Sequence, residues 1–238
     1  PETTEKCFNL KLRDSDIFIC SYPKSGTTWT QHIVLSLLLL ANSSLSYSHV
    51  SDYAPFFEID PHWELDELAP WIQSNHAKLG RRVFNTHLRF DMLPSRNAAS
   101  AAKFIYILRQ PLDTCVSFYH HLTNQVEDAY AGTFDDFFRE WMDGKIAFGS
   151  WMEHLASYLP VFSTGSQVKL KDGRKFLLVF YEEMVDNLPG VVDKLVDFLQ
   201  IDNVTTQQKA ELLPTFKFAA MKADLDRFQP KSVQWMNR

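Results

Sequence analysis

One short segment carries most of the chemistry that the sequence offers, and it reads Tyr22-Pro-Lys-Ser-Gly-Thr-Thr-Trp29. Gly26 allows a tight turn and lets the backbone approach a ligand closely. The amide groups of residues 25–28 can then point at one anion, and a helix that begins here would add the positive end of its dipole. Lys24 contributes a full positive charge, and the two threonines contribute further donors. This combination predicts a phosphate-binding loop that needs no metal ion.

Two other interpretations of the segment stay open on the residues alone. One is an ordinary turn between a strand and a helix, in which Thr27 or Thr28 only caps the helix. The other is the nucleoside-triphosphate loop GxxxxGK[ST]. Here Lys24 precedes Gly26, and no Lys-Ser or Lys-Thr pair follows to hold Mg²⁺. The lysine and the glycine at the end of a strand favour a phosphate site and leave a nucleotide kinase and a transferase both open.

Two further residues directly follow or end apolar runs. His87 comes after the run at 82–86, and imidazole titrates near neutral pH, so His87 is the candidate general base. Arg109 directly follows the run at 103–108. Its guanidinium fork suits phosphate oxygens, whereas packing does not explain an arginine at the end of an apolar strand. The other histidines are interpreted as structural, His120 and His121 among them, because their spacing matches no metal-ligand pattern.

These residues must be positioned by strands and helices that alternate along the chain. Buried strands are expected at residues 16–21, 82–86, 103–108 and 175–181. Helical patterns are expected from the threonines of the loop to about residue 41, and over 111–122, 133–141, 149–159, 182–199 and 205–213. This order predicts an α/β fold: a single domain over residues 1–238, with a central parallel sheet flanked by helices and the phosphate-binding loop after the first strand. Ligands of such sheets bind beyond the carboxyl ends of the strands.

The composition narrows the classes of function. A net charge of −5 argues against a nucleic-acid partner or a polybasic membrane partner. The longest apolar run, residues 33–41, is too short to span a bilayer. The three cysteines, Cys7, Cys20 and Cys115, show no paired pattern and are expected to be isolated thiols in a reducing compartment. We therefore expect a cytoplasmic protein that binds neither nucleic acid nor membrane.

Five groups of residues, in order along the chain, resemble the cytosolic sulfotransferase family. They are Tyr22–Trp29; Thr86-His87-Leu88; Tyr106-Ile-Leu-Arg109 with Asp113 and Ser117-Phe-Tyr119; Phe148-Gly-Ser-Trp151 with His154; and Phe180-Tyr-Glu-Glu-Met184. The resemblance covers roughly residues 15–222. It implies transfer of a sulfuryl group from 3′-phosphoadenosine 5′-phosphosulfate (PAPS) to a hydroxyl or amine of a small molecule, with 3′,5′-adenosine bisphosphate (PAP) as the product.

The resemblance also implies a role for each matching residue. His87 and Lys24 would be catalytic, the first as general base and the second at the leaving phosphate. The 5′-phosphosulfate would be bound by Lys24, Ser25, Gly26, Thr27 and Thr28. The 3′-phosphate would be bound by Arg109 and Ser117, and the adenine by Trp29, Tyr181, Phe218 and Met221. The acceptor would contact Phe56, Ile59, Asn85 and Phe148.

Several expectations accompany this assignment. An apolar, aromatic acceptor wall suits lipophilic alcohols such as phenols and sterols. No metal-ligand cluster is visible, and the expected chemistry needs none. The alternatives are a phosphate-loop nucleotide kinase or NTPase, and a nucleotide-binding protein without turnover; a homodimer is left open.

The end of the sequence carries one more expectation from the resemblance. The family has a later Arg-Lys-Gly segment, followed by Gly-Asp-Trp, that closes over the 3′-phosphate. The last residues, Gln234-Trp-Met-Asn-Arg238, resemble the lead-in to that segment. We therefore expect the domain to lack its cofactor-closing segment here and the natural protein to continue past Arg238.

Overall fold

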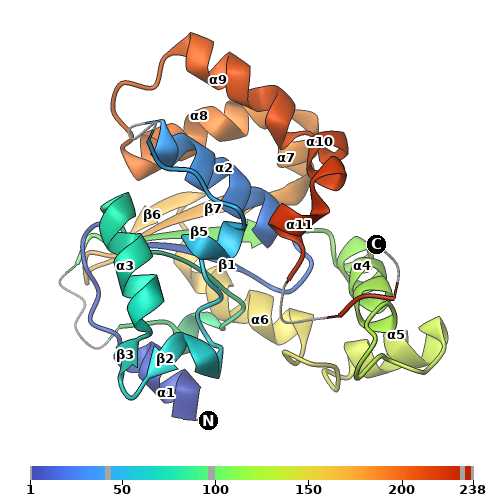
Figure 1. Cartoon of the computed structure of the whole chain (residues 1–238). Helices are drawn as coiled ribbons and strands as arrows, with labels where there is room; N and C mark the ends of the chain where they lie inside the picture. The colour runs from blue at the N-terminus through green and yellow to red at the C-terminus, as the bar shows by residue number, and fades with distance from the viewer. Residues whose placement is uncertain (1, 41–43, 96–99, 231–233, 237–238) are drawn as a thin grey trace.

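The computed structural model describes residues 2–40, 44–95, 100–230 and 234–236 and has a five-stranded sheet at its centre (Figure 1). The order across the sheet is β4-β1-β5-β7-β6. The strands are β1 (Ile17–Ser21), β4 (Val83–Thr86), β5 (Lys103–Leu108), β6 (Gln167–Lys169) and β7 (Lys175–Phe180). The four predicted strands are present and parallel, whereas β6 runs antiparallel to β7 at one edge. The sheet is therefore mixed and mostly parallel.

The register of the four parallel strands places one phenylalanine of each strand in a single row. Phe84, Phe18, Phe104 and Phe176 are paired across β4, β1, β5 and β7, and all four are fully buried. Successive ring centroids lie 4.9, 4.8 and 4.7 Å apart, with the planes nearly parallel. A shift of one residue in any strand would turn its phenylalanine to the opposite face, so this row helps to fix the register.

Helices cover both faces of the sheet. Helices α2 (Thr27–Leu39) and α8 (Leu188–Leu199) share one buried cluster with Ile19 and Ile105, while α6 (Trp151–Tyr158) and α3 (Pro70–Leu79) contribute to the cluster on the other face, which contains the phenylalanine row. The other α-helices are α1 (Glu2–Asn9), α4 (Pro111–Thr123), α5 (Phe134–Met142), α7 (Tyr181–Asp186), α9 (Thr206–Leu212), α10 (Phe218–Ala223) and α11 (Leu225–Phe228). A small hairpin pairs β2 (Trp63–Glu64) with β3 (Glu67–Leu68), and 3₁₀ turns occupy η1 (Val50–Asp52), η2 (Asp60–His62), η3 (Phe90–Met92), η4 (Leu159–Phe162) and η5 (Leu213–Phe216).

Local sequence explains where the helices near the site begin and end. Pro111 starts α4, where its missing N–H costs nothing, and the Gln110 side chain accepts a hydrogen bond from the amide of residue 113. The single helix predicted over 182–199 is two helices, so that prediction was wrong. Asn187 separates them in a non-helical conformation, and its side chain caps α8 by accepting from Gly190 N.

Helices α4 and α5 pack on a third buried cluster beside the first strand. It contains Tyr22, Cys115, Phe118 and Trp141, and it places α4 next to the loop that follows β1. The three cysteines are free thiols, as the isolated spacing predicted, and all three are buried. Burial raises the pKa of the Cys115 thiol to about 11.

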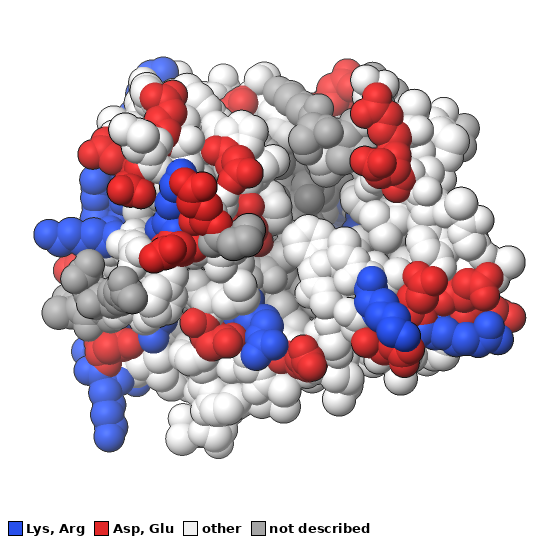
Figure 2. Space-filling model, turned by 90° about the horizontal axis from the view of Figure 1, so that it is seen from below, with Lys and Arg blue, Asp and Glu red and all other residues white. Residues whose placement is uncertain are grey.

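The surface carries charges of both signs. The lower face shows acidic and basic side chains intermingled around a largely uncharged middle (Figure 2). Among the described residues, no helix has the length and apolar character that crossing a membrane would require. The predicted end of the first long helix near residue 41 and the expected continuation past Arg238 fall on residues outside those described.

Candidate active site

The loop between β1 and α2 holds two residues in the left-handed conformation. Lys24 has φ of 67° and Gly26 has φ of 103°. A Cβ at Gly26 would lie 2.8 Å from Cδ2 of Tyr181, which is closer than carbon atoms can approach. Both the conformation and the available space therefore require glycine at position 26, in the tight turn that the sequence indicates.

The first turn of α2 is not capped by a side chain. Gly26 occupies the N-cap position, and Thr27 is the first helical residue. The Thr27 hydroxyl lies 2.6 Å from the Ser21 hydroxyl, so it ties the loop to the end of β1. The alternative interpretation, in which Thr27 or Thr28 only caps the helix, is therefore wrong. Within the described residues, the amides of this first turn keep their donors available at the positive end of the helix dipole, which suits an anion.

Arg109 lies at the end of β5 and joins the loop to Tyr181. Its Nη1 donates to the carbonyl oxygen of Lys24 at 2.9 Å, and its guanidinium carbon lies 4.3 Å from the centre of the Tyr181 ring. The Trp29 ring meets the same tyrosine edge-on at 5.7 Å. Four of the predicted nucleotide-binding residues, Lys24, Trp29, Arg109 and Tyr181, are thus in one cluster.

Two buried donors of this cluster have no hydrogen-bond partner among the described residues. They are Nε of Arg109 and Nε1 of Trp29. An unsatisfied buried donor costs roughly 1–3 kcal/mol, so such groups are rare unless something else satisfies them. The orphaned donors, the uncapped helix and Lys24 together fit an anionic nucleotide.

His87 follows β4 and has its tautomer fixed by the backbone. Its Nδ1 lies 2.8 Å from the carbonyl oxygen of Ser21, which can only accept, so Nδ1 carries the proton and Nε2 keeps its lone pair. The backbone N–H of His87 donates to a carboxylate oxygen of Glu58 at 2.5 Å. Burial, together with the positive charge of Lys24, lowers the pKa of His87 to about 4. At neutral pH the imidazole is uncharged and can accept a proton at Nε2.

Two of the predicted acceptor residues flank this imidazole. The rings of Phe56 and Phe148 each lie 5.3 Å from the His87 ring and 6.4 Å from each other. Phe148 is 49% exposed and has φ of 70°, so its ring forms a wall that remains open to solvent. The base therefore lies between an aromatic wall and the loop that carries Lys24.

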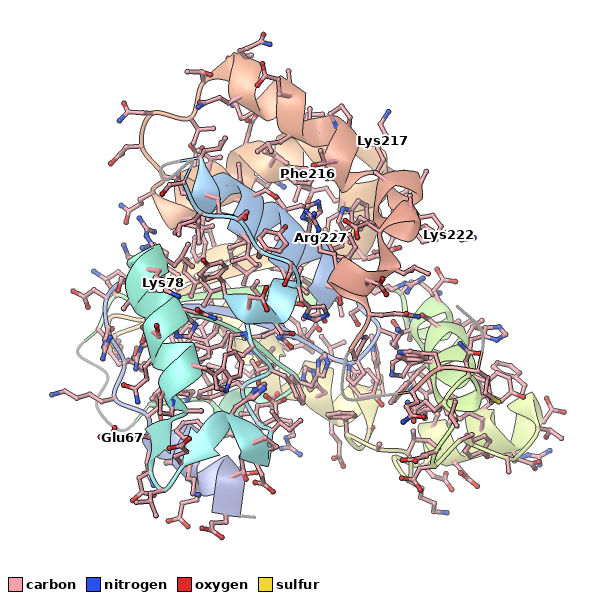
Figure 3. All side chains as sticks on the ribbon, viewed as in Figure 1. Glu67, Lys78, Phe216, Lys217, Lys222 and Arg227 are labelled. Carbon is pink, nitrogen blue, oxygen red and sulfur yellow. The ribbon has the colours of Figure 1, made fainter. Side chains whose placement is uncertain are left out.

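Other predicted residues lie differently. The Asn85 amide is buried and donates to the carbonyl of Ala54 at 2.8 Å, and Ile59 is half-buried before η2. Phe218 is 77% exposed, and Met221 is half-buried on the same short helix. Figure 3 shows Lys217 and Lys222 of this segment pointing away from the body. Acceptor contacts for Asn85 and Ile59, and adenine contacts for Phe218 and Met221, stay predictions.

The sequence reasoning missed two residues of the site. Glu58 anchors the backbone of His87, and burial raises the pKa of its carboxyl to about 7. His121, interpreted as structural, has its Nδ1 only 3.2 Å from Nζ of Lys24. The spacing offered a signal for it, because His121 is four residues after Ser117 and thus on the same face of α4.

Among the described residues, no group of three or more His, Cys, Asp or Glu side chains is placed to hold a metal ion. The chemical capacity of the cluster lies elsewhere. It offers a neutral imidazole that can take a proton, a lysine and an arginine that can balance negative charge, and backbone amides directed at an anion.

Comparison with known proteins decides the family. A family model described as "Sulfotransferase domain" matches residues 14–234. The chain belongs to the sulfotransferase family. Luciferin sulfotransferase of Photinus pyralis is 30% identical to this family member over 233 residues, which are 92% of this chain and 60% of that protein. Human sulfotransferase 2B1 is 31% identical over 225 residues, 90% of this chain and 53% of that protein. The chain thus spans between half and two thirds of the length of these relatives.

Solved structures agree with the fold of this family member. Mouse sulfotransferase SULT7A1, complexed with PAP, superimposes with a TM-score of 0.68 at 27% identity, covering 93% of this chain and 71% of that one. Retinol dehydratase in a complex with retinol and PAP gives a TM-score of 0.73, covering 95% of this chain and 71% of its own. At 21% identity, that second likeness supports the fold alone. The resemblance to sulfotransferases and the predicted α/β fold are both confirmed.

Proposed function

We propose that this chain is a PAPS-dependent sulfotransferase that sulfates a hydroxyl or amine of a small, lipophilic molecule. The observation that carries the proposal is the position of His87. Its uncharged imidazole, with Nε2 free to accept, lies between the aromatic pair Phe56–Phe148 and the loop of Lys24. A proton acceptor with an apolar wall on one side and a cationic loop on the other suits transfer from an anionic donor to an apolar acceptor.

The residues that would hold the donor are those of the cluster. The loop amides of residues 25–28 and Lys24 would bind the 5′-phosphosulfate, Arg109 and Ser117 the 3′-phosphate, and Trp29 and Tyr181 the adenine. When bound, PAPS supplies a sulfuryl group attached to a phosphate leaving group. The two orphaned donors, on Arg109 and Trp29, support this fit because they need acceptors.

Each residue then has one task. Nε2 of His87 takes the proton of the acceptor hydroxyl or amine as that group becomes a nucleophile. The Lys24 ammonium stabilises the negative charge that develops on the leaving side. Phe56 and Phe148 hold the apolar part of the acceptor beside the imidazole. Positioning and electrostatics supply the catalysis, as they do in phosphoryl transfer.

The location of the protein and its partners are also part of the proposal. A cytoplasmic location rests on the resemblance to cytosolic sulfotransferases, and a small-molecule acceptor rests on the aromatic pair beside His87. Neither nucleic acid nor membrane is included as a partner. A homodimer remains an open alternative.

Calorimetry and a transfer assay test the proposal. We expect PAP to bind equally well with Mg²⁺ or with a chelator, and we expect PAPS to sulfate at least one member of a panel of phenols, sterols and amines. Binding of ATP that depends on Mg²⁺, without binding of PAP, would indicate a nucleotide kinase instead. PAP binding without transfer to any acceptor would indicate a nucleotide-binding protein without turnover.

A further inference from the structure

The side chain of Lys24 is held at its far end by a histidine from another element. Nζ of Lys24 lies 3.2 Å from Nδ1 of His121, which projects from α4. At its near end, the carbonyl of Lys24 accepts the hydrogen bond from Arg109 at 2.9 Å. In the part of the chain that the structure describes, both ends of this lysine are therefore fixed.

The protonation state of His121 follows from the contact. An ammonium group can only donate, so Nδ1 must accept and the ring proton must sit on Nε2. Burial, and next the charge of Lys24, lowers the pKa of His121 to about 3. His121 therefore stays neutral, and stays an acceptor, throughout the pH range in which an enzyme works.

The imidazole of His121 is itself supported from its other side. The Trp235 ring meets it edge-on at a centroid distance of 4.9 Å. Residues 234–236 are tied to the end of α4, since Val126 N donates to Gln234 O at 2.8 Å and Met236 N donates to Asn124 O at 2.9 Å (Figure 1). An imidazole packed in this way can hold its partner in one place.

We propose that His121 is a positioning residue for Lys24, whose ammonium it holds at the phosphate loop and keeps charged. The inference rests on the proposed function, because Lys24 matters there as the cation beside the nucleotide. Three titratable groups face the lysine: His121 from α4, Arg109 from the end of β5, and His87 from the end of β4. Of these, only His121 accepts a hydrogen bond from the Lys24 ammonium within the described residues.

The acceptor has a consequence for the charge of Lys24. Burial, and next the charge of Arg109, already lowers the pKa of Lys24 to about 8. A hydrogen bond accepted from an ammonium favours its charged form, so we expect loss of the His121 acceptor to lower the pKa of Lys24 further. A larger part of the lysine than in the parent would then be neutral near pH 7.5, and its contribution to anion binding would be lost at a lower pH.

Two substitutions of equal size separate this role from packing. His121→Asn keeps an acceptor, because Oδ1 of asparagine occupies the place of Nδ1, whereas His121→Leu has the same shape without the acceptor. The adjacent, exposed His120→Leu serves as the control. We expect calorimetry to show PAP bound about tenfold or more weakly by His121→Leu at pH 7.5, as for loss of one charge-assisted hydrogen bond. The fall of affinity at alkaline pH should also begin at lower pH in this variant alone.

A second measurement does not depend on the nucleotide. NMR titration of the Lys24 ammonium in the ligand-free protein should give a lower pKa in His121→Leu than in the parent, and the parental pKa in His121→Asn. If both His121 variants match the parent, or if both bind weakly with an unchanged pKa of Lys24, the positioning role is overturned. If the parent binds no PAP while the pKa of Lys24 still falls only in His121→Leu, the contact stands and the proposed function fails.

Discussion

The chemistry of His87 is decided by which of its nitrogens carries the proton. The carbonyl of Ser21 holds the proton on Nδ1, and the charge of Lys24 helps to keep the ring neutral. His87 and Arg109 could be predicted as site residues from the sequence because each directly follows an apolar run. Parallel sheets bind their ligands beyond the carboxyl ends of such strands. It could not predict the contact of Lys24 with His121, which joins residues 97 positions apart and depends on the rotation of α4 about its axis.

We predict that His87→Ala loses sulfuryl transfer and keeps nucleotide binding. The base acts on the acceptor, so kcat should fall by roughly 10²–10⁴, the usual contribution of general-base catalysis. Calorimetry with PAP on the same preparation provides the control, and its Kd should stay within about threefold of the parent, well under the tenfold that 1.4 kcal/mol represents. Transfer at a near-parental rate would remove His87 from the role of base.

At the scale of elements, the site depends on how the β1–α2 loop meets the start of α7. The four parallel strands and the helices α2, α4, α5, α6 and α9 could be predicted from apolar runs and helical spacing. Strand β6 could not, because its three residues are not fully buried and carry little apolar pattern. The break between α7 and α8 was also missed, although the sequence carried a signal for it. Asn favours the N-cap over the helix interior, and Pro189 follows in the first turn of α8.

Gly26→Ala tests the meeting of this loop with Tyr181. Besides the strain of a left-handed alanine, about 1–2 kcal/mol, the new methyl group would lie 2.8 Å from the Tyr181 ring and displace it. Arg109 stacks on that ring, so we expect PAP affinity to fall at least about tenfold, the loss of one charge-assisted contact.

Gly80→Ala is the matched control, because Gly80 has φ of 72° but open space around its Cβ position. We expect it to lower the free energy of unfolding by the strain alone and to leave PAP binding unchanged. Urea denaturation and calorimetry on both variants make the comparison. Equal losses of stability together with parental PAP binding in Gly26→Ala would contradict the assignment of the loop.

For the molecule as a whole, burial keeps five of the eight histidines neutral near pH 7. It is the largest cause of a pKa that is lowered from 6.5 to about 4 in three of them and to about 3 in two others. These residues are His32, His76, His87, His121 and His154. Such imidazoles form hydrogen bonds inside the protein. His76 donates its ring N–H at Nε2 to Val83 O, and His32 Nδ1 bonds to the Tyr47 hydroxyl.

We predict that the protein loses stability as the pH falls from about 6.5 to about 4, the interval between the ordinary and the lowered pKa values. In this interval the unfolded chain binds protons at these histidines while the folded chain does not, so protonation favours unfolding. Glu58, whose pKa is raised to about 7, acts in the opposite direction but is a single group.

Urea denaturation at a series of pH values measures the effect. The free energy of unfolding should fall by more than about 2 kcal/mol between pH 7 and pH 4.5, an amount of the order that one strongly shifted group contributes. A free energy that stays flat or rises over this interval would show that the histidines are not held neutral in the folded protein.

The three buried cysteines can report how often the structure around each of them opens. Cys20 lies in β1, Cys7 is the buried residue of α1 and belongs to the cluster that contains the phenylalanine row, and Cys115 lies on α4 in the third cluster. A thiol reagent in solution reaches each only when the surrounding structure comes apart, and the rate of modification then counts those events. Mass spectrometry of the modified peptides would give a separate rate of modification for each cysteine. The rate at Cys115 reports on the region beside the phosphate loop, and the other two rates report on the cluster that contains the phenylalanine row. If a nucleotide slows the modification of Cys115 alone, ligand binding makes local opening around α4 rarer and leaves the opening of the sheet unchanged.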